Sequence, residues 1–374
     1  MFGPAGRRRS GRRFESWAGL RVNKSMSATK SAGERRDASP GPVDPAGGTP
    51  AAGTPVFRRI ARYTQVGRLS GLYLWVAVIV FFAIEIPETF LTQTTVQGII
   101  GNQAVTVIVA TGALIALTSG CFDLSVGQNL GMSAVFLGWF SVNAHLSPGI
   151  AIVLTLLIGA AVGAVNAILV VVIGIDSFIV TLGMSSVLFA ITQIVSDQHY
   201  IGPLPKALQD FTNWQQWGLS GYDYYAIACA IICWMVLEHT AAGRRSAATG
   251  ANKAAARLVG IATGRHQAIG LIACATLAGF AGILVAGKVG TISPTIGPEY
   301  LLPAYAACFL SATQLKPGRF NVWGMVLALF LLGTGATGLQ LLGGQGWVGD
   351  MFTGVALIIA VGFAVVTQRR RKSA

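Results

Sequence analysis

The chain has 374 residues, of which 53% are hydrophobic and only 11% are charged. Because a soluble domain carries about 25% charged residues, this composition excludes a soluble enzyme and predicts a membrane protein. The net charge of +13 does not indicate a nucleic-acid-binding protein, since 23 of the 27 Lys and Arg residues lie in residues 1–68, 239–266 and 369–372.

Residues 1–68 form a basic segment whose composition differs from that of the rest of the chain. It carries 14 Lys and Arg residues among many Pro, Gly, Ala, Ser and Thr residues, so it cannot bury enough apolar area to fold. Polar residues and a glycine interrupt Phe14–Leu20, which argues against a secretory signal. We expect a disordered cytoplasmic tail that sets topology, or an arm that binds anionic lipid headgroups. Met26 resembles a translation start, so residues 1–25 are interpreted as a mis-assigned beginning.

Residues 69–368 are interpreted as a transmembrane domain, because uncharged runs recur at the length of a membrane helix, about 20 apolar residues. They predict an all-α, polytopic membrane protein with about ten transmembrane helices. In chain order the expected spans are Leu72–Ile86, Val96–Leu117, two within Leu124–Ile175, Ser177–Ser196, one that begins with Tyr224–Leu237, Gln267–Gly287, Tyr300–Leu315, one within Phe320–Gly349, and Met351–Gln368.

The basic segments predict the orientation, because Lys and Arg are retained on the cytoplasmic side of a membrane. Both termini, including the basic tail 369–374, and the loop Arg244–Arg265 are therefore expected in the cytoplasm. The segment Asp197–Tyr222 has a single basic residue, Lys206, and two Trp residues. It is expected on the outer side, where aromatic residues mark the membrane interface.

Asp123 is the acidic residue that points most clearly to a functional site. It lies between two uncharged runs of 34 and 52 residues, and an ionisable group at membrane depth is costly unless it has partners. Ser125 and the backbone N–H groups freed by Gly120 and Gly127 are expected to supply them. The alternative is a cap for the N-terminus of the next helix, the role that we also expect for Asp176.

The basic loop Ala241–Gln267 contains a second candidate site. Asn252–Leu258 is rich in strong helix formers, and Gly260 follows as a helix stop. A short basic helix between two membrane spans has little of its own chain to pack against. We expect it either to lie on the membrane surface or to dock into a partner on the cytoplasmic face.

Three motifs, in order, resemble those of the permease subunit of bacterial ATP-binding-cassette (ABC) importers for monosaccharides, of the ribose, xylose and rhamnose type. Gly120–Gly127 is similar to the family's Gly-Gly-Ile-Asp-Leu-Ser-Val-Gly, and Ser177–Met184 is similar to its Pro-Phe-Ile-x-Thr-Leu-Gly-Met. Gly250–Ile261 is similar to its cytoplasmic Gly-x-Asn-x-x-Ala-Ala-Arg-Leu-Ser-Gly-Ile. The resemblance covers nearly all of Leu72–Val366. The chain departs from the family in Ser311–Asn321, where several glycines are missing.

The resemblance implies a transport subunit rather than an enzyme, in an ATP-driven importer that moves a monosaccharide, such as a pentose, across the cytoplasmic membrane. The basic helix would couple to a separate ABC ATPase that binds ATP and Mg, so no cofactor is expected in this chain. The other implied partners are an extracytoplasmic sugar-binding protein at Asp197–Tyr222, a second permease copy and membrane lipid, with no nucleic acid. The implied coupling residues are Asn252, Ala254, Ala255, Arg257, Leu258 and Gly260.

The same resemblance implies that the solute crosses the membrane at the interface of two permease copies. Its path needs a polar wall, on which an aromatic face stacks against a sugar ring and amide or carboxylate groups bind hydroxyls. The candidates for this wall are Asn102, Gln103, Asp123, Ser125, Phe178 and Thr181.

Two other function classes compete with the importer. An ion-gradient-driven secondary transporter would use intramembrane acids, and Asp123 with Glu299 or Asp350 would supply them. A membrane-embedded enzyme would need acids or histidines clustered at one interface, whereas the four His residues fall in separate segments. Gly282–Val289 nearly matches the spacing of a phosphate-binding loop, but it ends in Val where a magnesium-binding hydroxyl is needed. We interpret it as a chance match, and the five scattered cysteines as packing residues.

Overall fold

The computed structural model describes residues 66–316 and 318–372, and this part of the chain is mostly helical. The expected tail 1–68 lies outside the described residues except for its last three positions. The elements are α2 (Val66–Glu85), α3 (Pro87–Phe90), α4 (Gln93–Thr118), α5 (Val126–Gly138), η1 (Trp139–Asn143), α6 (Pro148–Ala167), η2 (Ile168–Ile173), α7 (Ser177–Ser196), α8 (Lys206–Asn213), β1 (Gln215–Gln216), β2 (Leu219–Ser220), α9 (Gly221–Trp234), η3 (Met235–His239), α10 (Ala241–Ala251), α11 (Lys253–Leu258), α12 (Thr263–Val289), η4 (Gly297–Tyr300), α13 (Leu301–Ser311), α14 (Val322–Leu341) and α15 (Trp347–Lys372).

Six helices of the described chain are long and apolar enough to cross a membrane. They are Gln93–Thr118, Pro148–Ile173, Ser177–Ser196, Gly221–His239, Thr263–Val289 and Val322–Leu341. The membrane protein predicted from composition is thus confirmed, whereas the number of about ten spans stays a prediction. The apolar helix α13 has 11 residues, and two further apolar stretches, Gly71–Glu85 and Trp347–Ile359, are also shorter than the six.

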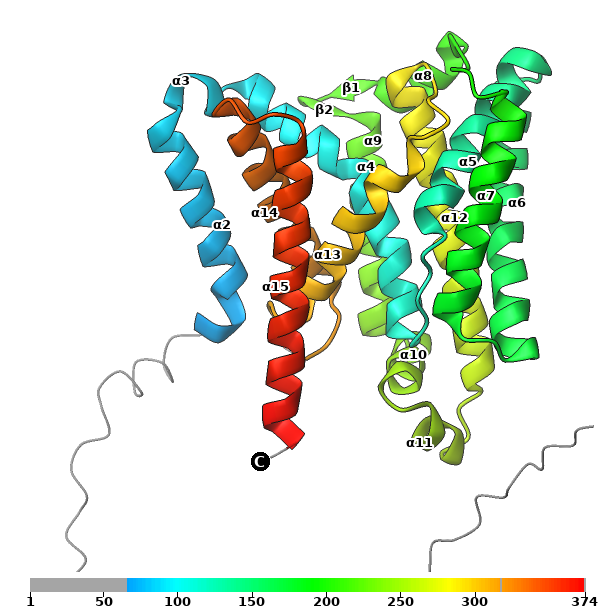
Figure 1. Ribbon diagram of the computed structural model, residues 1–374, viewed down its shortest axis with the longest axis vertical. Helices are drawn as coiled ribbons and strands as arrows, with labels where there is room; N and C mark the ends of the chain where they lie inside the picture. The colour runs from blue at the N-terminus through cyan, green and yellow to red at the C-terminus, as the bar shows by residue number, and fades with distance from the viewer. Residues whose placement is uncertain (1–65, 317, 373–374) are drawn as a thin grey trace, which may run out of the picture. The chain divides into compact units, whose positions relative to one another are not determined.

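Helices α4 and α12 form the centre of the bundle, where α5, α6, α9, α13 and α14 pack against one or both of them (Figure 1). Helices α2 and α15 pack on the outside of α14, and α7 packs on α5. Ile108 and Leu114 of α4 and Leu284 of α12 have no exposed surface. The two helices approach closely at Gly112, where an added Cβ would lie 3.0 Å from the carbonyl oxygen of Cys274. Small residues bring membrane helices together because lipid provides no hydrophobic drive for their association. This glycine therefore explains how two long apolar helices form one core.

Helices α4 and α12 end in the same local structure. Each is followed by a glycine with a left-handed backbone, Gly120 (φ 82°) and Gly290 (φ 75°). Residues 120–127 and 290–297 then share one pattern: glycine, any residue, apolar, polar, any residue, hydroxyl, apolar, glycine. In both segments the side chain at the polar position accepts a hydrogen bond from the backbone N–H two residues later. The N–H of Ser125 donates to Asp123 Oδ1 at 3.0 Å, and the N–H of Thr295 donates to Ser293 Oγ at 3.3 Å. The short helices α5 and α13 begin after these breaks.

The two matching segments meet at their final glycines. A Cβ added to Gly297 would lie 2.4 Å from the carbonyl oxygen of Gly127, and one added to Gly127 would lie 3.0 Å from the carbonyl oxygen of Gly297. Neither backbone has room for a side chain. The breaks after the two central helices are therefore held against each other by direct backbone contact.

The ends of the bundle differ in structure. Helices α10 and α11 lie at one end, and α3, α8 and the β1–β2 hairpin lie at the other (Figure 1). The hairpin pairs Gln215 with Ser220, and this ribbon of two short strands is a local feature of a mostly helical protein, as the expected all-α class predicts. It forms because Gly218, with φ 80°, supplies the left-handed turn, while Trp214 stacks on Tyr224 with ring centres 4.9 Å apart.

Replacement of Gly297 by Ala should destabilise the protein by about 1–3 kcal/mol, the usual cost of overpacking a filled core. Its Cβ would collide with backbone rather than with a movable side chain. The measurement is the thermal unfolding midpoint of the purified full-length chain in detergent. Gly183→Ala in α7 is the matched control, because an added Cβ there meets no atom within 4 Å. Equal midpoints for the two variants would contradict the packing.

Candidate functional site

The segment between α4 and α5 carries Asp123 through the interior of the protein in a non-helical conformation. Asp123 has no exposed surface. Its backbone N–H donates to the hydroxyl of Tyr305 at 2.9 Å, and that hydroxyl donates to the carbonyl oxygen of Asp123 at 2.9 Å. The Tyr305 side chain therefore replaces both hydrogen bonds that the backbone of Asp123 would make in a helix.

The first turns of α7 provide the partners for the residues on either side. The N–H of Phe122 donates to Ser177 Oγ at 3.1 Å, and the N–H of Leu124 donates to Thr181 Oγ1 at 3.0 Å. Non-helical backbone at membrane depth is tolerated where the protein itself satisfies the polar groups. The hydroxyls of α7 and α13 thus make this break possible.

The carboxyl group of Asp123 is satisfied on one oxygen. Its Oδ1 accepts from the N–H of Ser125 at 3.0 Å and from Ser125 Oγ at 2.5 Å. Asn166 of α6 donates to the same Ser125 hydroxyl at 3.0 Å. Asp123 Oδ2 has no hydrogen-bond partner among the described residues, and the thiol of Cys274 lies beside the carboxyl group.

The two roles weighed for Asp123 can now be compared with its contacts. The residue at the N-terminal cap of α5 is Ser125, whose side chain makes no capping bond. Asp123 holds the turn before the helix, and the partner expected from the sequence, Ser125, is confirmed. The expected cap at Asp176 is also confirmed, since its Oδ1 accepts the N–H of Phe178 at 2.9 Å.

The six residues predicted for a polar wall fall into separate places. Asp123, Ser125 and Thr181 lie together around the break. Asn102 and Gln103 lie about four helical turns earlier on α4, where Asn102 Oδ1 accepts from Lys288 Nζ at 3.2 Å and the Gln103 side chain packs at Gly333. Phe178 is 49% exposed on α7.

Sequence reasoning missed two residues that complete the site, Tyr305 and Asn166. Their signal is weak, because each is a single polar group within an apolar helix, and such groups are common in membrane proteins. Tyr305 lies 182 positions from Asp123 in the chain. The pairing therefore becomes visible only in the fold.

Helix α11 forms as the sequence predicts. Asn252 caps it by accepting the N–H of Ala255 at 3.0 Å, and Gly260 ends it with φ 81°. Arg257 donates to Thr263 Oγ1 at 3.0 Å, which ties the helix to the start of α12. Leu258 is 89% exposed. A short helix is thus fixed at both ends and presents an apolar residue to its surroundings.

Helix α10 connects this exposed helix to the break at Asp123. A Cβ added to Gly250 of α10 would lie 2.4 Å from the carbonyl oxygen of Thr118, the last residue of α4. One added to Gly120 would lie 3.0 Å from the Cα of Gly250. Backbone of α10 therefore rests directly on the backbone of the segment that leads from α4 to Asp123.

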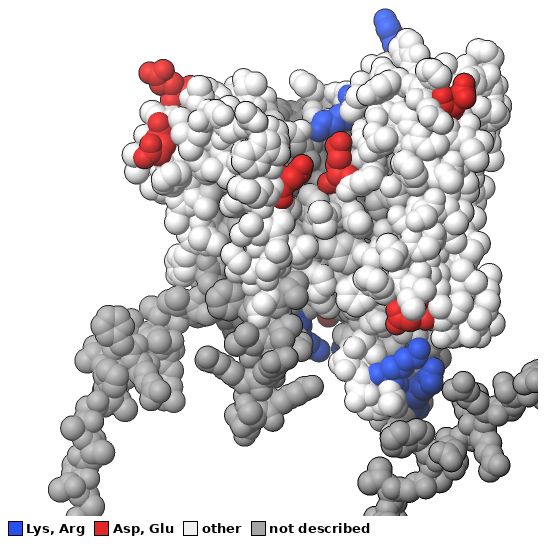
Figure 2. Space-filling view, viewed as in Figure 1, with Lys and Arg blue, Asp and Glu red and all other residues white. Residues whose placement is uncertain are grey.

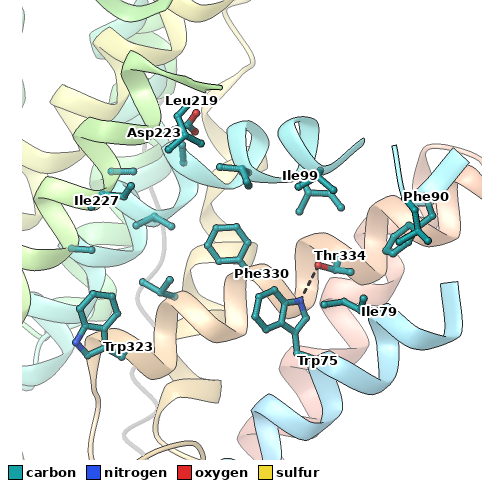
Figure 3. Close-up of a pocket in the computed structure, with 18 residues that line it drawn as sticks. Trp75, Ile79, Phe90, Ile99, Leu219, Asp223, Ile227, Trp323, Phe330 and Thr334 are labelled. Atoms are coloured by element: carbon teal, nitrogen blue, oxygen red, sulfur yellow. Dashed lines mark hydrogen bonds between the residues drawn. The ribbon is translucent and has the colours of Figure 1, made fainter. Parts of the chain in front are cut away.

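A cavity of about 480 Å³ lies between α2, α4, α9 and α14, and none of the six predicted wall residues lines it. Its walls are almost entirely apolar (Figure 3). Two polar groups on opposite walls are Asp223 and Thr334, and Thr334 accepts from Trp75 Nε1 at 3.0 Å. No group of three or more His, Cys, Asp or Glu residues that could hold a metal ion occurs within the described residues.

Comparison with known proteins assigns the chain to a family. Residues 95–361 match the family model described as "Branched-chain amino acid transport system / permease component". The chain belongs to this family of permeases. The match begins in α4 and ends in α15, so it includes the break at Asp123 and both α10 and α11.

Among individual proteins, the chain is similar to permeases of importers for autoinducer 2 and for ribose. It is 31% identical over 260 residues to the autoinducer 2 import system permease protein LsrD of Photorhabdus luminescens, covering 68% of this chain and 78% of the relative. It is 30% identical over 293 residues to the ribose import permease protein RbsC of Escherichia coli K12, covering 76% of this chain and 91% of the relative. No solved structure matches the chain.

These comparisons confirm the resemblance to ABC sugar permeases found in the three motifs. The chain is a multi-pass protein of the cytoplasmic membrane and a transport component rather than an enzyme.

Replacement of Tyr305 by Phe should lower stability by about 1–3 kcal/mol, the cost of leaving buried polar groups without partners. The change leaves the N–H and the carbonyl oxygen of Asp123 without hydrogen-bond partners and removes no apolar contact. Thermal unfolding in detergent measures the effect. Tyr300→Phe is the control, because the Tyr300 hydroxyl makes no hydrogen bond within the described chain. A Tyr305→Phe variant as stable as this control would rule out the role assigned to the hydroxyl.

Proposed function

We propose that this protein is the transmembrane permease subunit of an ATP-driven importer for a monosaccharide or a related small polar solute, and that a separate ABC ATPase powers it. The observation that carries the proposal is the exposed helix α11, capped by Asn252 and ended by Gly260, in a chain that belongs to a permease family. The relatives import ribose and autoinducer 2, which supports a sugar-like solute.

The contacts of α10 support coupling through this helix. We expect α11, with Asn252, Ala254, Ala255, Arg257, Leu258 and Gly260, to dock into a cleft of the ATPase. Because α10 follows α9 and rests on the end of α4, nucleotide-driven movement of α11 would displace the break after α4. ATP and Mg would then bind only to the partner, and this chain would need no cofactor.

A topology of about ten spans with both termini in the cytoplasm fits this coupling. The first residues of α2 and the last residues of α15 lie at the same end as α10 and α11 (Figure 1). On the face shown in Figure 2, charged side chains gather towards the two ends of the bundle and leave an uncharged region between them. Such a band suits the hydrocarbon core of a bilayer, about 30 Å thick.

The opposite end is the expected docking surface for an extracytoplasmic binding protein. It includes α8 and the hairpin, where Trp217 is 89% exposed. A second copy of the permease would complete the path of the solute. Asp123, Ser125 and Thr181 are the candidates that lie together, and their oxygens are acceptors that suit sugar hydroxyls.

Replacement of Asp123 by Asn should lower uptake about tenfold or more, because a charge-assisted hydrogen bond is worth about 1.5–3 kcal/mol. Uptake is measured with the assembled transporter in vesicles, with energisation by ATP. Glu88→Gln in the first turn of α3 is the control, since this acid is exposed and lies outside Asp197–Tyr222. Wild-type uptake by an assembled Asp123→Asn protein would refute a direct role. ATP-independent uptake driven by a proton or sodium gradient would instead favour a secondary transporter.

Replacement of Leu258 by Asp should abolish ATP-dependent uptake and the co-purification of the ATPase without destabilising the permease. The side chain is 89% exposed, so a charge there disturbs a partner rather than the fold. Tyr200→Asp at the opposite end, where the side chain is 72% exposed, is the control for co-purification of the ATPase. Normal ATPase binding by the Leu258→Asp protein would mean that α11 does not couple the two subunits.

A further inference from the structure

The apolar cavity between α2, α4, α9 and α14 is a second feature of the membrane domain that can bind a ligand. Its volume of about 480 Å³ falls within the ~300–1,000 Å³ of typical small-molecule sites. Figure 3 shows aromatic and aliphatic side chains from all four helices around it, among them Trp75, Ile99, Ile227 and Phe330. A sugar would lose its hydration against such walls and gain few hydrogen bonds. The cavity therefore suits a hydrocarbon chain and not the transported solute.

One wall of the cavity carries a carboxyl group of which only one oxygen has a hydrogen-bond partner. Asp223 belongs to the first turn of α9, and its Oδ2 accepts the N–H of Ser220 at 2.9 Å in a capping box. Its Oδ1 has no hydrogen-bond partner among the described residues, and the side chain is only 5% exposed. A buried carboxylate oxygen without a donor is costly. The site thus lacks a hydrogen-bond donor at this position.

Lys288 does not fill this position. It is close enough to Asp223 for the two charges to interact, but its ammonium donates to the carbonyl oxygen of Gly101 at 2.8 Å and to Asn102 Oδ1 at 3.2 Å. No ion pair joins Asp223 to a cation within the described residues. Because Asp223 lines the cavity, a molecule that enters the cavity can supply the missing donor.

We propose that this cavity is a binding site for one phosphatidylethanolamine molecule of the surrounding membrane. Its acyl chain lies along the apolar walls, and its ammonium group donates a hydrogen bond to Asp223 Oδ1. Asp223 follows directly on the β1–β2 hairpin at one end of the bundle, the level at which a lipid headgroup lies when its chain extends along the helices. The negative charge of Asp223 complements the ammonium group and disfavours phosphatidylglycerol, whose headgroup carries no cation.

The recognition depends on the N–H groups of the headgroup. Phosphatidylcholine has the same charges, but its quaternary nitrogen has no proton to donate. Phosphatidylethanolamine should therefore bind more tightly than phosphatidylcholine by about tenfold, the factor expected for one hydrogen bond to a charged group. The acyl chains can be kept identical in this comparison, so the apolar contribution cancels.

The test is native mass spectrometry of the delipidated full-length chain, titrated separately with the three lipids. We expect saturable binding of one phosphatidylethanolamine, and a loss of about tenfold in its affinity in Asp223→Asn. Asp210→Asn on α8 is the matched control, because this acid is exposed and does not line the cavity. Equal binding of all three lipids, or an Asp223→Asn variant with wild-type affinity, would overturn the proposal.

A second variant tests the cavity without altering the carboxyl group. Ala230 is buried on α9 and lines the cavity, whereas Ala228 on the same helix is exposed and does not. Ala230→Phe should abolish the bound phosphatidylethanolamine, and Ala228→Phe should leave it unchanged. Lipid retained by Ala230→Phe would place the bound molecule elsewhere. If Ala230→Phe instead changed the oligomeric state with lipid binding intact, the cavity would be an interface with a second copy and the proposal would be wrong.

Discussion

Backbone polar groups inside a bilayer need partners from the protein, because the hydrocarbon offers no hydrogen bonds. This constraint explains the most unusual feature of the chain, a non-helical segment that carries Asp123 between α4 and α5. Tyr305 of α13 and the hydroxyls of Ser177 and Thr181 on α7 replace the helical hydrogen bonds that this segment gives up. Three helices that are distant in sequence are thereby joined at one place, and the acid is held where lipid cannot reach it.

The same segment connects the interior of the protein to its charged end. The glycine after α4 rests on Gly250 of α10, and α10 leads into the exposed helix α11. At its other end the segment abuts the matching break after α12, through Gly127 and Gly297. Close-packed backbone transmits displacement because it has no side chains that can yield. In the proposed coupling, a push on α11 would reach both breaks at once, as expected of a permease driven from the cytoplasm.

Local signals in the sequence predicted much of this structure. Uncharged length predicted α7 as Ser177–Ser196, and the helix formers of Asn252–Leu258 with the Gly260 stop predicted α11. The repeat of residues 120–127 at 290–297 was missed because it amounts to a few positions of shared character, and its meaning depends on the contact between its two copies. Tyr305 and the cavity at Asp223 were missed for a related reason: each depends on helices far apart in the chain. The position of Phe178, exposed on α7, shows that a motif identifies a helix without showing which way its side chains face.

The central claim is that α11 faces the cytoplasm and is the part of the permease to which an ATPase binds. It is tested most directly with a single cysteine at position 258 in an otherwise cysteine-free chain, labelled with a membrane-impermeant thiol reagent. We expect labelling in inside-out vesicles, protection when the ATPase is bound, and none in intact cells, whereas a cysteine at position 217 should show the reverse sidedness. Labelling of position 258 from outside the cell, or labelling that bound ATPase leaves unchanged, would contradict the proposed coupling.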